Sequence, residues 1–69
     1  MKKVIGLTFT AADEYMHSKG YKLFESNGTT NRVIYVKGHR RVDLIFLLYP
    51  KVGYLCTRIE KRRTKHYYK

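Results

Sequence analysis

The stretch that decides the fold runs from Arg32 to Glu60 and reads "RVIYVKGHRRVDLIFLLYPKVGYLCTRIE". It holds three runs rich in β-branched, aromatic and other apolar residues, separated by "GHRR" and by "PKVG". Such residues favour strands, whereas Gly and Pro mark turns. Connections this short join antiparallel neighbours, because parallel strands need a long crossover. We therefore predict an antiparallel meander of three strands, followed by a chain end of different composition.

Upstream of this meander, the sequence predicts two more strands and one helix. The run "VIGLTF" (residues 4–9) is typical of a strand, and so is "YKLFES" (residues 21–26), which is followed by the turn "NGTTN". Between them, "TAADEYMHSKG" carries helix start and stop signals over about ten residues. We expect Thr10 to cap the helix with Asp13 in the first turn, and Gly20 to end it.

Together these elements predict an α+β protein. We expect one small domain over residues 1–60, with an antiparallel sheet of three or four strands and one N-terminal helix packed on one face, in the order β-α-β-β-β. Residues 61–69 are expected to form a basic and aromatic C-terminal tail or a short helix. The single cysteine, Cys56, leaves no disulfide to support a thin core and favours a reducing compartment, so we predict a cytoplasmic protein.

The strand from Val42 to Tyr49 is apolar on both of its sides apart from Asp43. One helix covers only one face of such a strand, so the other face needs the chain's own end, a second copy or a partner protein as its cover. We predict a homodimer or a protein partner as possible occupants. The predicted protein interface consists of Ile45, Leu47 and Tyr49. The core is expected to contain Phe9, Phe24 and Phe46.

The charge balance points to a polyanionic partner. Fifteen Lys and Arg stand against five Asp and Glu, which gives a net charge of +10. Such a field attracts nucleic acid first, and an anionic membrane or an acidic protein second. The longest strictly apolar run, Leu44 to Tyr49, is far too short to span a membrane, so we predict no membrane partner.

The cations group around the "GHRR" turn and in "EKRRTKHYYK" (residues 60–69). If the last strand pairs beside Val42–Tyr49, its end lies near the "GHRR" turn, and the two groups converge at one end of the sheet. Arginine and lysine there would bind phosphate, and the terminal tyrosines would stack on unpaired bases. The predicted nucleic-acid-binding residues are Lys37, Arg40, Arg41, Arg58, Lys61, Arg62, Arg63, Lys65, Tyr67 and Tyr68.

Catalysis has little support in the sequence. His39, flanked by Arg40 and Arg41, is the best general acid or base for a basic nuclease, while His17 and His66 lie far from it in the chain. One cysteine and three scattered histidines show no metal-ligand spacing, and no glycine-rich phosphate loop is present. We predict no catalytic residue, no metal and no cofactor.

The helix–sheet order and "SKGYKLFES" (residues 18–26) resemble small HicA-type toxin ribonucleases. The resemblance implies a catalytic histidine in the strand after the first hairpin. Here that region reads "TTNRVIYV" (residues 29–36) and contains no histidine. We therefore assign no family from this resemblance.

Three functional hypotheses follow. The first is a small, basic, non-enzymatic nucleic-acid-binding protein, with a slight preference for DNA over RNA. The alternative is a phage or mobile-element accessory or inhibitor protein that binds a host protein or nucleoprotein. The second alternative is a small basic ribonuclease centred on His39.

Overall fold

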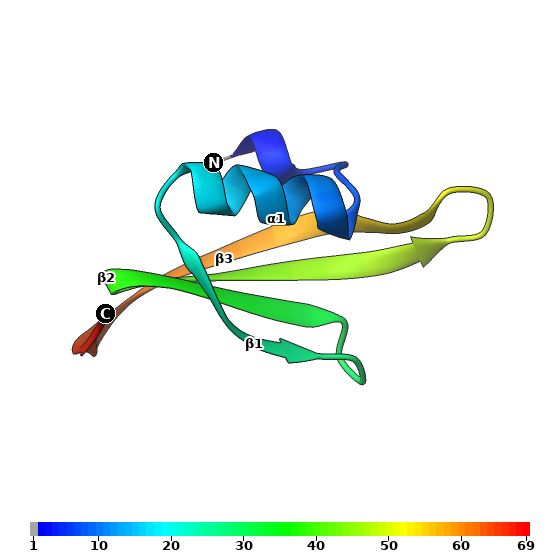
Figure 1. Cartoon of the computed structure of the whole chain (residues 1–69). Helices are drawn as coiled ribbons and strands as arrows, with labels where there is room; N and C mark the ends of the chain where they lie inside the picture. The colour runs from blue at the N-terminus through cyan, green and yellow to red at the C-terminus, as the bar shows by residue number, and fades with distance from the viewer. Residues whose placement is uncertain (1) are drawn as a thin grey trace.

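A computed structural model describes residues 2–69 of the chain. Its elements are a 3-10 turn η1 (Lys2–Val4), the helix α1 (Phe9–Ser18), and the strands β1 (Lys22–Asn27), β2 (Arg32–Tyr49) and β3 (Gly53–Tyr68). The strands form one antiparallel sheet in the order β1-β2-β3, and α1 lies across one face of it (Figure 1). The predicted α+β class is confirmed, with an N-terminal helix that contacts β3.

The predicted first strand over residues 4–9 is wrong. Gly6 has a φ of +87°, which interrupts an extended run, and the helix already begins at the end of this segment. The segment instead runs beside β3. The Gly6 amide donates to the Cys56 carbonyl (2.7 Å), and the Cys56 amide donates to the Leu7 carbonyl (2.9 Å). The observed order is therefore α-β-β-β.

The N-cap of the helix lies two residues before the predicted one. Thr8, not Thr10, is the N-cap, and its hydroxyl accepts a hydrogen bond from the Ala11 amide at 3.4 Å. Phe9 thereby enters the first turn of the helix rather than a strand. The predicted end is confirmed, because Gly20 adopts a φ of +86° just beyond the last turn.

β2 folds back on itself. The Phe46 amide donates to the Asn31 carbonyl at 2.9 Å, and Arg32 Nη1 lies 2.8 Å from Asp43 Oδ2. A straight strand would hold the first pair about 50 Å apart. Between these contacts Gly38 has a φ of +61°, and the ribbon of β2 reverses beside the C-terminal end of β3 (Figure 1). The turn predicted in "GHRR" therefore exists, centred on its glycine.

The two arms of β2 have different neighbours. β1 pairs with the first arm (residues 32–36), while β3 pairs with the second (residues 40–49) and with Gly38. β2 is thus one extended segment that reverses at Gly38, where it also pairs with Tyr68 of β3. The strands predicted before and after the turn are thus the two arms.

The predicted tail or short helix over residues 61–69 is also wrong. β3 continues to Tyr68 without a break. The second arm of β2 offers it a ladder of backbone partners as far as Arg40, and Gly38 pairs with Tyr68 after a bulge. Backbone hydrogen bonding therefore orders a segment that has no aliphatic side chain of its own.

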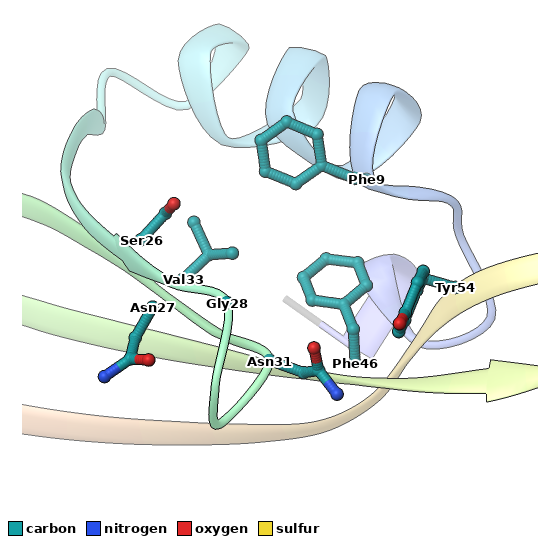
Figure 2. Close-up of a pocket in the computed structure, with 8 residues that line it drawn as sticks. All are labelled: Phe9, Ser26, Asn27, Gly28, Asn31, Val33, Phe46 and Tyr54. Atoms are coloured by element: carbon teal, nitrogen blue, oxygen red, sulfur yellow. The ribbon is translucent and has the colours of Figure 1, made fainter.

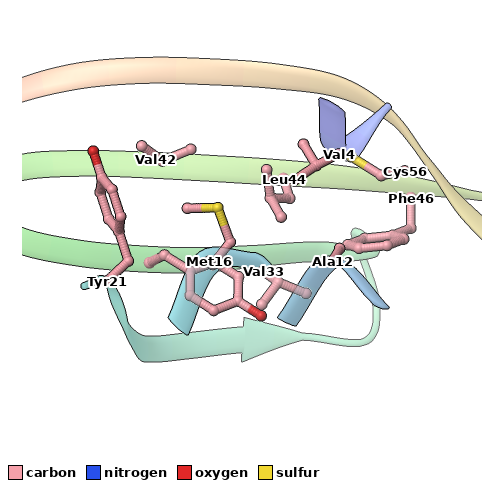
Figure 3. Packing of buried hydrophobic residues seen from close by; sticks show 10 residues of the cluster. Val4, Ala12, Met16, Tyr21, Val33, Val42, Leu44, Phe46 and Cys56 are labelled. Atoms are coloured by element: carbon pink, nitrogen blue, oxygen red, sulfur yellow. The ribbon is translucent and has the colours of Figure 1, made fainter. Parts of the chain in front are cut away.

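The core lies between α1 and the sheet (Figure 3). Its buried members are Val4, Ala12, Met16, Tyr21, Val33, Tyr35, Val42, Leu44, Phe46 and Cys56. Of the three phenylalanines predicted for the core, Phe46 is buried, but Phe9 and Phe24 are 42% and 52% exposed. The prediction fails for these two because Phe9 lies at the edge of α1 and Phe24 lies at a bulge in β1.

Candidate nucleic-acid interface

The predicted convergence of cations is present. Arg40 lies directly opposite Arg63 in the ladder between the second arm of β2 and β3, and Arg41 lies opposite Arg62. Like charges directly opposite one another destabilise a sheet. Two successive arginine pairs of this kind concentrate positive charge at one end of the molecule and lower the local stability unless negative charge compensates them.

The two arginine pairs face opposite sides of the sheet. Val42 points to the core beneath α1, and side chains alternate along a strand, so Arg40 and its partner Arg63 share the helix side. Lys61, opposite Val42, lies on the same side. Arg41 and its partner therefore lie on the helix-free side.

Lys37 joins the helix side from the first arm of β2. Its ammonium donates to the Lys19 carbonyl at 2.8 Å, at the C-terminal end of α1, and lies 5.7 Å from the centroid of the Tyr21 ring. The negative end of the helix dipole and the aromatic face both favour a cation there. We call Lys37, Arg40, Lys61 and Arg63 the basic end.

A hollow of about 450 Å³ opens at the basic end. Its lining residues are Tyr21, Arg40, Arg41, Val42, Lys61, Arg62 and Arg63. Among residues 2–69, Arg40, Lys61 and Arg63 form no ion pair with a carboxylate. Their positive charge is therefore available to an external anion.

The helix-free side has a different chemistry, because its arginines are paired. Asp43 is fully buried, and its carboxylate accepts from Arg41 Nε (2.8 Å) and from Arg32 Nη1 (2.8 Å). Burial alone would raise the pKa of Asp43, but the hydrogen bonds from the two guanidinium groups outweigh it and hold the pKa below its usual range. Asp43 is therefore a buried carboxylate that stays ionised.

Glu60 lies directly opposite Asp43 and extends this network. Its Oε1 accepts from Arg32 at 2.7 Å, and Arg58 and Arg62 approach the same carboxylate to 3.2 Å and 3.7 Å. The Arg32 hydrogen bond is the main reason that the pKa of Glu60 is lowered. Glu60 thus forms ion pairs with three guanidinium groups at once.

The terminal aromatic residues belong to β3 and contact other aromatic rings. The ring of Tyr68 lies 5.0 Å from that of Phe24 and 4.7 Å from that of His66. Because Phe24 belongs to β1 and Tyr68 to β3, this contact brings the end of β3 across β2. Tyr67 is 61% exposed, and the centroid of its ring lies 5.1 Å from that of His39 in an edge-to-face arrangement. Of the two tyrosines, Tyr67 is the more accessible to a base.

The remaining predicted site residues, Lys65 and Arg58, do not line the hollow at the basic end. Lys65 is exposed beyond Thr64, and His39 Nδ1 lies 3.1 Å from the Thr64 carbonyl. Arg58 is exposed on the helix-free side, farther along β3.

The predicted protein interface lies near the opposite end of the sheet. Ile45 is half-buried, whereas Leu47 and Tyr49 are exposed on the hairpin that joins β2 to β3. This hairpin projects beyond α1 (Figure 1) and also exposes Leu48 and Val52. The last two were missed by the sequence analysis, because only the position of α1 decides how far along the strand the core extends.

A shallow groove adjoins this hairpin and was not predicted. Figure 2 shows Phe9 above it and Phe46 below it, with Tyr54 at one side. Its volume is about 190 Å³, and Asn27 and Asn31 supply polar groups at its rim. Helix α1, the β1–β2 turn, β2 and β3 each contribute to it, so no single stretch of sequence signals it.

No protein-family model, curated protein or solved structure matches this chain. Among residues 2–69, no helix is long and apolar enough to cross a membrane. The fold and the site together define a small α+β protein with a strongly basic end and an exposed apolar hairpin.

Proposed function

We propose that this protein binds nucleic acid without catalysing a reaction, and that the basic end makes the main phosphate contacts. The observation that carries this proposal is the pair of opposed arginines, Arg40 and Arg63, which no carboxylate neutralises among residues 2–69. A polyanion would relieve their mutual repulsion and release its own counterions on binding.

Tyr67 supports a contribution from base stacking. Its ring is largely exposed next to the "GHRR" turn, so it lies close to the cations that would hold the backbone. Stacking of one base on an aromatic side chain is worth about 1–3 kcal/mol and tolerates any sequence. This favours a single-stranded or locally unpaired polymer. Tyr68, packed on Phe24, is expected to contribute less.

The test is to remove charge at the basic end and at a matched site. The variant Arg40→Gln/Arg63→Gln is compared with Lys2→Gln/Lys3→Gln, which removes the same charge from the exposed turn η1. Binding of labelled single- and double-stranded oligonucleotides is measured by fluorescence anisotropy, from about 50 to about 200 mM salt. We expect the first variant to lose most of the affinity and to lower the log–log salt slope by about 2.

Two outcomes would contradict the proposal. Equal losses of affinity in the two variants would show that binding depends only on the net charge of the protein. Wild-type affinity no higher than that of an unrelated protein of equal charge would exclude a nucleic-acid function for the basic end.

A second candidate function is protein binding through the apolar hairpin. Leu48 is 59% exposed and Val52 is 63% exposed, at the end of the β2–β3 ladder away from the basic end. Contiguous apolar surface of this kind is typical of interaction sites. Analytical ultracentrifugation of wild type and Leu48→Ser would test self-association. If both proteins are monomeric, the homodimer is excluded, and the remaining candidate for the hairpin is a different protein.

A further inference from the structure

The helix-free side of β3 carries two exposed arginines on either side of one carboxylate. Arg58 and Arg62 are each two residues from Glu60, so all three side chains project from the same face of the strand. Arg58 Nη2 lies 3.2 Å from Glu60 Oε2, and Arg62 Nη2 lies 3.7 Å from Glu60 Oε1. The two guanidinium groups therefore form ion pairs with different oxygens of one shared carboxylate.

Glu60 is itself fixed from below. Its Oε1 accepts from Arg32 at 2.7 Å, and Arg32 is bound at the same time to the buried Asp43. A carboxylate held in this way offers a defined position to any cation beside it. Arg58 and Arg62 are therefore partly ordered before any ligand arrives.

These arginines retain most of their hydrogen-bonding capacity. A guanidinium group carries five N–H donors, and each of these two side chains directs only one nitrogen at Glu60. Their side chains are 71% and 58% exposed, so the unused donors face solvent. Planar arginine donors match phosphate oxygens well, and prior ordering lowers the entropy lost on binding.

The position of this row connects it to the basic end. Arg62 is adjacent in sequence to Arg63, whose side chain points to the helix side. β3 is the outer strand of the sheet, so a polymer that follows its edge would meet Lys61 and Arg63 on one face and the Arg58–Glu60–Arg62 row on the other. A continuous phosphate backbone can reach both.

We propose that Arg58 and Arg62 form a second phosphate-binding site for the nucleic acid and that Glu60 is the positioning residue that holds them. This inference rests on the proposed function, because it concerns the same polymer. It has an unusual consequence: removing the negative charge of Glu60 weakens binding to a polyanion.

The experiment compares Glu60→Gln with Glu25→Gln. Both variants raise the net charge by one, but Glu25 is exposed on β1 and forms no ion pair among residues 2–69. Simple electrostatics predicts tighter binding for both. We expect tighter binding only for Glu25→Gln, and for Glu60→Gln a several-fold weaker affinity with a salt slope lower by about 1.

A second pair of variants separates positioning from folding. Arg58→Lys and Arg62→Lys keep the charge but lose the planar donors, so we expect each to weaken binding in wild type and to have little further effect in Glu60→Gln. Circular dichroism shows whether each variant is folded at the assay temperature. If Glu60→Gln is unfolded, the affinities of Arg58→Lys and Arg62→Lys for nucleic acid become the test. Unchanged affinity in both of these variants would overturn the inference.

The outcomes for the two proposals are distinct. Glu60→Gln binding as tightly as Glu25→Gln, while Arg40→Gln/Arg63→Gln still binds poorly, would overturn this inference and leave the basic end intact. Absence of wild-type binding would overturn both. Competition by inorganic phosphate at low millimolar concentration would indicate a site for free phosphate rather than for a polymer, and would also contradict the inference.

Discussion

Asp43 is the residue on which the helix-free side of the sheet depends. It is fully buried and lies between Val42 and Leu44 in the strand, yet two guanidinium groups donate hydrogen bonds to its oxygens. A buried charge is tolerated only with such partners. The sequence shows Asp43 as the one interruption of an apolar strand, but not which arginines neutralise it. Arg32 reaches it only because β2 doubles back.

Replacement of Asp43 by alanine should be strongly destabilising. Arg41 and Arg32 would lose their shared acceptor and remain close to one another. Removing one partner from a buried ion pair costs about 3–5 kcal/mol, and partial exposure of both arginines argues for the lower end of that range, about 3 kcal/mol. Urea denaturation measures this loss. A change within experimental error would show that the network adds no stability.

Stability should also fall in acid through the same carboxylate. The pKa of folded Asp43 is held below its ordinary value, so its contribution is complete above that value, about 3.9, and is lost as the pH falls through the lower folded pKa. We expect a constant midpoint of thermal unfolding above about pH 5 and a steep decline below about pH 4. Asp43→Asn should show a shallower decline over the same interval.

At the scale of elements, α1 depends on a cap that the sequence suggested at the wrong threonine. Thr8 accepts from the Ala11 amide, whereas Thr10 lies inside the helix. Thr8→Ala should therefore lower the free energy of unfolding by about 1 kcal/mol, and Thr10→Ala by clearly less. Denaturation of the two variants side by side measures the difference. A larger loss for Thr10→Ala would place the helix start where the sequence first suggested.

The end of β3 is an element of the fold as well as a candidate binding segment. Tyr68 packs on Phe24 of β1, and Gly38 pairs with Tyr68. An aromatic pair of this kind adds about 0.5–1.5 kcal/mol beyond the apolar area that it buries. Deleting residues 66–69 should lower the midpoint of urea unfolding, whereas a solvated tail could be removed without effect. Phe24→Ala should reproduce much of the loss.

At the scale of the whole molecule, the basic end and the exposed apolar hairpin are separated, although the hairpin carries one cation of its own, Lys51. The basic end lies at the β2 turn, and the exposed apolar hairpin lies at the far end of the same ladder. A long two-stranded ladder is what makes this separation possible. Under the proposed function, the polyanion binds at the basic end and the hairpin stays accessible to a protein partner.

The net charge of +10 should make the folded protein sensitive to anions. A single-stranded oligonucleotide at about 100 times its Kd should stabilise the native state by about 2.7 kcal/mol and raise the Tm accordingly. The gain should be much smaller for Arg40→Gln/Arg63→Gln. Differential scanning fluorimetry at fixed salt provides the measurement. An equal gain in both proteins would place binding away from the basic end.

The sequence alone determined the class of the fold, the existence of α1, its Gly20 stop, and the order of the later strands. These follow from local properties: glycine at positive φ, turn residues, and the strand preference of β-branched and aromatic side chains. It also indicated that the cations meet, because a hairpin fixes which ends of two strands are adjacent.

Only the tertiary structure decided which cations are free and which are neutralised. Arg40 and Arg41 are neighbours in the sequence with the same chemistry, yet Arg40 faces the helix side with no carboxylate partner among residues 2–69, and Arg41 binds Asp43. The sequence also did not show that residues 61–68 form a strand. Backbone pairing with β2 holds them in place, rather than packing of their own side chains. Both depend on partners distant in the chain, and a local pattern carries no information about such partners.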